Sequence, residues 1–99
     1  MEYGCYICNK LIKTGEKFTF TKDGSVHFDC FIATKRKNVH EEKQEYLRTL
    51  SLILDYQLTY LVALLGVKTD DKESQELLRK RISSIEKEGG EITNIIYNL

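Results

Sequence analysis

GCYICNK, residues 4–10, places the thiols of Cys5 and Cys8 three positions apart in a chain that has only one other cysteine. Such a pair alone fits a redox centre, part of a disulfide framework or half of a metal site. A second pair follows in SVHFDCF, residues 25–31, and completes the pattern C-x2-C-x18-H-x2-C through His27 and Cys30. Three sulfurs and one imidazole are the ligand number and type of a closed, tetrahedral structural zinc site.

The alternatives to zinc are weaker. An odd number of cysteines argues against a disulfide scaffold, and thioredoxin-like redox pairs occur in a βαβ pattern that this sequence lacks. We therefore expect one structural Zn²⁺ per chain, with redox chemistry or free thiols as the alternatives; the expected ligands are Cys5, Cys8, His27 and Cys30. MEYGCYICNK, residues 1–10, has neither the basic nor the apolar region of a secretory signal, which favours a reducing cytoplasm.

The composition limits the class of protein. With 99 residues the chain can form one domain, or a small domain with an extension, and has limited room for a core. Its 15 basic and 15 acidic side chains cancel, so no bulk charge draws it to nucleic acid or to an anionic membrane. The two signs are unevenly distributed, because residues 1–40 carry seven basic and four acidic side chains and residues 41–99 carry eight and eleven.

The residues between the two ligand pairs predict a β-hairpin. In KFTFTKDGSVHF, residues 17–28, apolar and polar residues alternate around the turn signal Asp23-Gly24. Asn9, directly after the first pair, suits the positive φ that a metal-binding turn requires. We expect the phenylalanines to form a small core over the metal: Phe18, Phe20, Phe28 and Phe31.

A short helix is expected at the second ligand pair. Asp29 is a suitable cap for a helix over FIATKRK, residues 31–37. Cys30 would then lie in the first turn, where the helix dipole favours a thiolate. Knuckle, hairpin and ligand-bearing helix start together predict a treble-clef-like finger over residues 1–38.

Two long helices are predicted after this finger. Asn38 with Glu41 forms a variant of the capping box, and helix-forming residues run from 39 to 65, where Gly66 follows. A second helix is expected over residues 70–98, because apolar residues or glycine recur at steps of four and three: Leu78, Ile82, Ile85, Gly89, Ile92, Ile96 and Leu99. The matched lengths favour one antiparallel helical hairpin in residues 39–99.

Gly89 and Gly90 test this assignment, since glycine pairs often end a helix. The apolar register nevertheless continues in phase on both sides of them. We expect the helix to continue through the pair, with the glycines opposite Tyr46 and Leu47 of the first helix.

The first long helix is apolar over more than one face. One stripe of leucines is the expected core face: Leu47, Leu50, Leu54, Leu58, Leu61 and Leu65. A second stripe consists of Tyr46, Ile53, Tyr56, Tyr60 and Leu64, so the apolar arc spans roughly 240°, more than one partner helix can cover. A membrane span is the alternative, but Asp55 and Gln57 interrupt the apolar run. The second stripe therefore predicts a homodimer, with an interface at Ile53, Tyr56, Tyr60 and Leu64.

Two resemblances support this interpretation. CYICNKLIKTGEKFTFTKDGSVHFDCF, residues 5–31, resembles the first zinc finger of LIM domains, although no cysteine remains to build a second finger. The whole chain resembles a family of short, uncharacterised archaeal proteins in which a CYIC-type pair, a G-x-x-FTFTK segment and an H-x2-C pair precede two helices. The resemblances imply a small, metal-bound α+β fold, with a LIM-like or treble-clef zinc finger before the helical hairpin. The LIM likeness also implies a scaffold-like interaction role.

Three functional classes follow from these features. Catalysis is not expected, because the four ligands leave no open zinc position and no phosphate loop or paired-carboxylate cleft is recognisable. Nucleic-acid binding, as in a transcription regulator, is the alternative hypothesis, since Lys35, Arg36 and Lys37 form a basic cluster. The leading hypothesis is a zinc-binding interaction, scaffold or regulatory module that self-associates and presents its finger to an unidentified protein. No membrane contact and no small-molecule substrate are expected.

Overall fold

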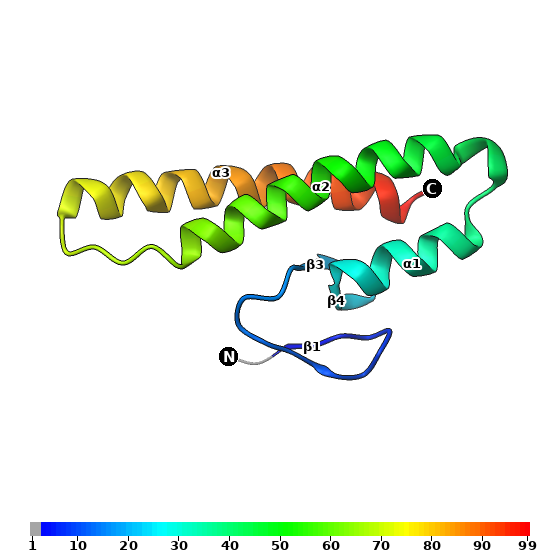
Figure 1. The fold of residues 1–99 in the computed structure, drawn as a ribbon, viewed down its shortest axis with the longest axis horizontal. Coiled ribbons are helices and arrows are strands. Elements are labelled where there is room, and N and C mark those ends of the chain that lie inside the picture. Colours follow the sequence, from blue (N-terminus) through cyan, green and yellow to red (C-terminus); the bar gives the residue numbers. More distant parts are fainter. Residues whose placement is uncertain (1–2) are drawn as a thin grey trace.

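The computed structural model describes residues 3–99, in which four short strands and a helix precede two long helices (Figure 1). Strand β1 (Tyr3–Gly4) pairs antiparallel with β2 (Leu11–Ile12), and β3 (Phe18–Thr21) pairs antiparallel with β4 (Gly24–His27). This arrangement confirms the predicted small α+β fold with N-terminal hairpins.

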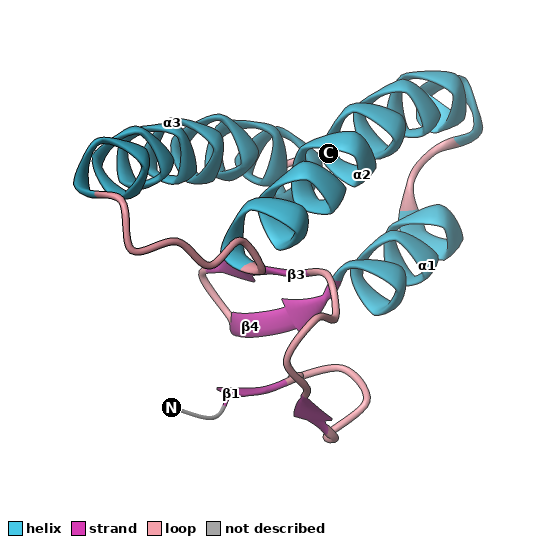
Figure 2. Ribbon diagram, turned by 60° about the vertical axis from the view of Figure 1, so that its left-hand side comes forward, coloured by secondary structure: helices cyan, strands magenta, loops and turns pink. Residues whose placement is uncertain are grey.

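The helices follow in the predicted order. Helix α1 (Phe28–Asn38) continues directly from β4, and a 3-10 turn (Glu41–Lys43) leads into α2 (Gln44–Leu65). Helix α3 (Lys72–Tyr97) returns along α2, so the two long helices form the predicted hairpin (Figure 2).

The β3–β4 hairpin differs from the prediction by one residue. Thr21 pairs with Gly24, so the loop consists of Lys22 and Asp23 rather than of Asp23 and Gly24. Gly24 has a φ of 124° and begins β4, which explains why glycine is suited to this position. The positive φ predicted for Asn9 is confirmed at 63°.

The start of α1 and the start of the first long helix also differ from the prediction. His27 is the N-cap of α1 and the helix begins at Phe28, so Asp29 lies in the first turn instead of capping it, while Cys30 is in the first turn as expected. Asn38 is the last residue of α1 and not the cap of the next helix.

Asn38 does not cap the next helix because α1 ends separately, before that helix begins. The Gln44 side-chain amide donates hydrogen bonds to the carbonyls of Arg36 and Val39, each at 2.9 Å, and so satisfies the end of α1. The predicted helix over residues 39–65 therefore begins at Gln44, after the 3-10 turn.

Helix α3 begins at Lys72, where the Asp71 carboxylate accepts a 2.9 Å hydrogen bond from the Ser74 backbone N–H. It continues through both glycines to Tyr97, as predicted. The predicted neighbours of the glycines are wrong, because a Cβ at Gly89 would lie 3.8 Å from Leu54 Cδ1. The linker over residues 66–71 allows α3 to be displaced by about two turns along α2.

One core is shared by the N-terminal hairpins and the helices. Its buried side chains come from all parts of the chain: Cys5, Val26, Phe28, Phe31, Ile32, Leu47, Leu50, Leu54, Leu58 and Ile96. The predicted burial of Phe28 and Phe31 is confirmed, whereas Phe20 is 55% exposed and packs edge-on against Tyr3 and Phe18. Leu65, expected in the core stripe, is exposed at the end of α2.

Polar contacts fix the metal-ligand region against the long helices. The hydroxyls of Thr19 in β3 and Thr93 in α3 are buried and lie 2.7 Å apart. The Lys17 ammonium group forms an ion pair with Asp55 of α2. Because buried hydroxyls require partners, the threonine pair fixes the register of β3 on α3.

No helix in residues 3–99 combines the length and the apolar character that crossing a membrane requires.

The threonine pair gives a test of this packing. Thr93→Val leaves the buried Thr19 hydroxyl without its partner and should lower the free energy of unfolding by about 1–3 kcal/mol. The double variant with Thr19→Val removes both polar groups and should recover much of that loss. Urea denaturation of both single variants and the double variant measures the interaction free energy between Thr19 and Thr93. Strictly additive losses of stability would contradict the proposed hydrogen bond.

Candidate metal centre

The four predicted ligands converge at one point. The ligand atoms of Cys5, Cys8, His27 and Cys30 all lie within 4.8 Å of one another. Cys5 and Cys8 come from the turn between β1 and β2, His27 ends β4, and Cys30 lies in the first turn of α1. The β1–β2 turn, the hairpin and α1 therefore meet at a group that can hold one metal ion.

The turn after β1 has the geometry of a zinc knuckle. The Asn9 N–H donates to the Cys5 carbonyl at 2.8 Å, and the Cys5 N–H donates to the Lys10 carbonyl at 2.9 Å. The positive φ of Asn9 closes this turn, and the backbone N–H groups of Ile7 and Cys8 before it are hydrogen-bonded to the Cys5 sulfur.

These N–H groups favour the thiolate form of Cys5. Burial alone would raise the pKa of Cys5, but N–H groups of Cys8, His27 and Ile7 lower that pKa to about 6. Burial raises the pKa of Cys30 to about 12, and the neighbouring Cys5 and Cys8 sulfurs add to the increase. A divalent cation would remove this repulsion, since it stabilises several thiolates at once.

His27 presents one ring nitrogen to the sulfurs and the other to a carboxylate. Its Nδ1 lies 3.4 Å from Cys8 Sγ and 3.8 Å from Cys30 Sγ, and its Nε2 lies 3.2 Å from Glu16 Oε1. Burial would lower the pKa of His27, but hydrogen bonds with Cys5, Glu16 and Cys8 raise it to about 8. An Nε2–H donated to Glu16 leaves the Nδ1 lone pair for a metal, the usual arrangement of a carboxylate behind a histidine ligand.

The distances fit a tetrahedral ion. Metal–sulfur and metal–nitrogen bonds of about 2.3 Å and 2.0–2.1 Å place a sulfur and a nitrogen on neighbouring corners about 3.5 Å apart. The sulfur–nitrogen distances of 3.4 and 3.8 Å bracket this value. The site can therefore accept an ion by small side-chain shifts.

Glu16 was not predicted from the sequence. Its carboxylate also accepts a 2.6 Å hydrogen bond from the Lys13 N–H, which fixes the turn containing Gly15 at a φ of 92°. The available signal was the segment TGEK, residues 14–17, a glycine-containing turn with an acid directly after the glycine. Nothing in its spacing indicates which histidine that acid contacts.

The predicted basic cluster lies on α1, away from the ligand atoms. Lys35 is partly buried, donates a 2.7 Å hydrogen bond to the Tyr97 carbonyl and lies over the Tyr97 ring. Arg36 and Lys37 are exposed. One of the three cations is therefore held within the fold.

The predicted interface residues lie together on α2. Ile53, Tyr56 and Tyr60 are 41%, 69% and 45% exposed, and Leu64 is half-buried. Their side of the helix is opposite to the buried leucines.

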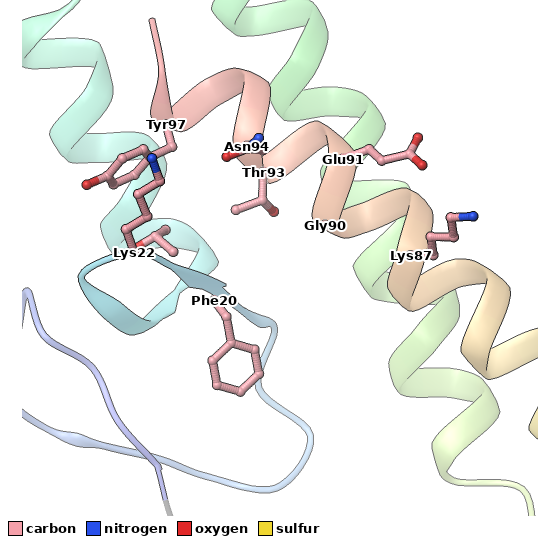
Figure 3. A pocket seen from close by; sticks show the side chains of 9 residues that line it. Phe20, Lys22, Lys87, Gly90, Glu91, Thr93, Asn94 and Tyr97 are labelled. Carbon is pink, nitrogen blue, oxygen red and sulfur yellow. The ribbon is translucent and has the colours of Figure 1, made fainter.

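A hollow of about 530 Å³ lies between β3 and α3 (Figure 3). Phe20 and Lys22 border it on the hairpin, and Gly90, Asn94 and Tyr97 border it on the helix. Its lining contains no histidine or cysteine. None of the four candidate metal ligands lines this hollow.

The fold and the ligand group define a small α+β protein with a Cys3His group that could hold a metal ion, formed by the N-terminal hairpins and the start of α1. Over residues 1–98 the chain matches a family described as "Uncharacterized protein conserved in archaea (DUF2175)", and it belongs to that family. This confirms the archaeal resemblance seen in the sequence. A search of curated proteins and a search of solved structures each found no match.

The contact between Glu16 and His27 gives a test of the centre. Glu16→Ala removes the acceptor for His27 Nε2–H and should weaken metal binding by about 10- to 100-fold, whereas Glu16→Gln should weaken it less. Competition with a chromophoric chelator measures the affinity. Glu42→Gln is the matched control, because Glu42 is exposed beside His40. Equal affinities for Glu16→Ala and the native chain would contradict a supporting role for Glu16.

Proposed function

We propose that this protein is a non-enzymatic, zinc-stabilised interaction module that self-associates through the outer face of α2. The observation that carries the proposal is a continuous row of exposed apolar side chains on α2. It is accompanied by four side chains that could close a tetrahedral metal site. A fixed metal site without an open coordination position supports structure, whereas an exposed apolar row supports association.

Zinc is the metal favoured by the ligand chemistry. Thiolate and imidazole ligands in a tetrahedral arrangement are the preferred surroundings of Zn²⁺ in structural sites. The N-terminal hairpins are short, and each contains only two- or four-residue strands. Units of this size gain much of their stability from the metal, so zinc binding would contribute directly to folding.

Zinc content tests this part of the proposal. Protein purified without added metal should contain about one zinc per chain by elemental analysis. Cys30→Ser should lose that zinc and unfold the N-terminal hairpins, visible as lost amide dispersion for residues 3–27. Asp29→Asn is the control at the exposed neighbouring position. This variant should keep its zinc and its folded N-terminal hairpins. A folded, metal-free native protein in strong chelator would count against a structural zinc.

The row on α2 supports self-association because solvent surrounds it in the monomer. Tyr46, Ile53, Tyr56 and Tyr60 are each at least 41% exposed, although all are large and apolar or aromatic. A second copy related by a two-fold axis would present the same row and cover it. Further burial of each such side chain contributes up to about 1.5–3 kcal/mol, so several together can offset the cost of association.

The oligomeric state tests the second part. Ile53→Glu combined with Tyr60→Glu should convert a dimer into a monomer that retains its metal, because two carboxylates in each copy would be buried at the interface. Light scattering at about 100 μM and zinc analysis measure the two properties. Leu11→Glu is the control, since Leu11 is 56% exposed on β2 and not on α2. A native protein that is monomeric under these conditions would refute self-association.

A further inference from the structure

A groove separates the segment that supports the metal site from the second half of α2. We name it the loop–helix groove; its apolar walls are Tyr3, Ile12 and Phe18 on the strand side and Leu61, Val62 and Leu65 on the helix. The cavity has a volume of about 420 Å³. It lies on a different side of α2 from Ile53 and Tyr60, since neither residue lines it.

Contacts beside the groove position its two walls. The Lys17–Asp55 ion pair and the Thr19–Thr93 hydrogen bond hold the strands against the middle of the helical hairpin. Beyond Asp55, α2 continues to Leu65 and forms the opposite wall. The turn at Gly15 remains open, because no atom beyond its two chain neighbours lies within 4 Å of the position that a Cβ would occupy there.

The charges around the groove limit what it can bind. Glu16 contacts the Lys13 N–H and His27, and Lys17 is paired with Asp55. Within residues 3–99, the ammonium group of Lys13 is the one cation of the groove lining that is in no ion pair. A complementary ligand therefore has an apolar body and a single anionic group.

We propose that the loop–helix groove is a binding site for a small amphiphilic molecule, whose apolar body contacts Leu61, Val62 and Leu65 and whose anionic group pairs with Lys13. The size and lining of the cavity are those of small-molecule sites. This proposal goes beyond the interaction role and does not depend on self-association.

The groove and the metal centre share a wall. Glu16 lines the groove and also holds the Nε2 atom of His27, so the conformation of residues 13–17 affects both sites. A ligand that stabilises this conformation also stabilises the metal-binding geometry. Because linkage is reciprocal, a bound ligand should strengthen metal binding, and the metal should strengthen ligand binding by the same factor.

Two fluorescent probes test the site on the metal-loaded full chain. 8-Anilinonaphthalene-1-sulfonate has an apolar body and one anionic group, and N-phenyl-1-naphthylamine has a similar body without the charge. The sulfonate should bind saturably with one site per chain. Val62→Glu should weaken both probes at least tenfold, whereas Lys13→Ala should weaken the sulfonate several-fold and leave the neutral probe within twofold.

Leu77→Glu is the control for exposed apolar surface, because Leu77 is 62% exposed on α3 and does not line the groove. It should leave both affinities unchanged. Val62→Trp fills the groove without adding charge and should also abolish binding of both probes. It provides the same test if Val62→Glu fails to fold. Saturating sulfonate should raise the zinc affinity severalfold, measured at equilibrium by competition with a chromophoric chelator.

Any of three results would overturn the proposal: no saturable binding to the native chain, equal losses in Val62→Glu and Leu77→Glu, or unchanged sulfonate affinity in Lys13→Ala. Each of these readouts is independent of the oligomeric state. A monomeric native protein would therefore refute self-association without affecting the ligand site.

Discussion

Three sulfurs and one imidazole converge at the point where all the N-terminal segments of this fold meet. Strands of two and four residues cannot form a stable core alone. Cys5 and Cys30 bring together the β1–β2 turn and α1, and His27 adds the β3–β4 hairpin. Once these segments are joined, Val26, Phe28 and Phe31 present one apolar surface to the long helices.

The sequence predicts well which four side chains converge, because the pattern of candidate metal ligands is specific and local. Two ligand pairs, each with two intervening residues, leave few alternatives to a metal site. The periodicity of α3 also correctly indicates that Gly89 and Gly90 do not end the helix. The relative position of the helices could not be obtained in this way. Gly89 packs against Leu54 rather than beside Tyr46, because side-chain packing, and not loop length alone, determines that displacement.

Residues that act through tertiary contacts were also beyond sequence reasoning. Glu16 lies 11 positions from His27 and its role depends on the fold of the intervening hairpin. Thr19 and Thr93 form their hydrogen bond across almost the whole chain, and each alone is an ordinary polar residue in its element. By contrast, the exposed second stripe of α2 follows from helical periodicity, since it requires only the angular positions of Ile53, Tyr56 and Tyr60.

The contacts between the hairpin and α3 have a kinetic consequence. Thr19 with Thr93, and Asp23 with Tyr97, each join residues that are 74 positions apart. Such distant pairs form only after the intervening chain has been ordered, and this loop closure slows folding relative to a helical bundle with local contacts. During synthesis Cys5, Cys8, His27 and Cys30 leave the ribosome long before α3, so these four side chains are available to one another before α3 can pack on the β3–β4 hairpin.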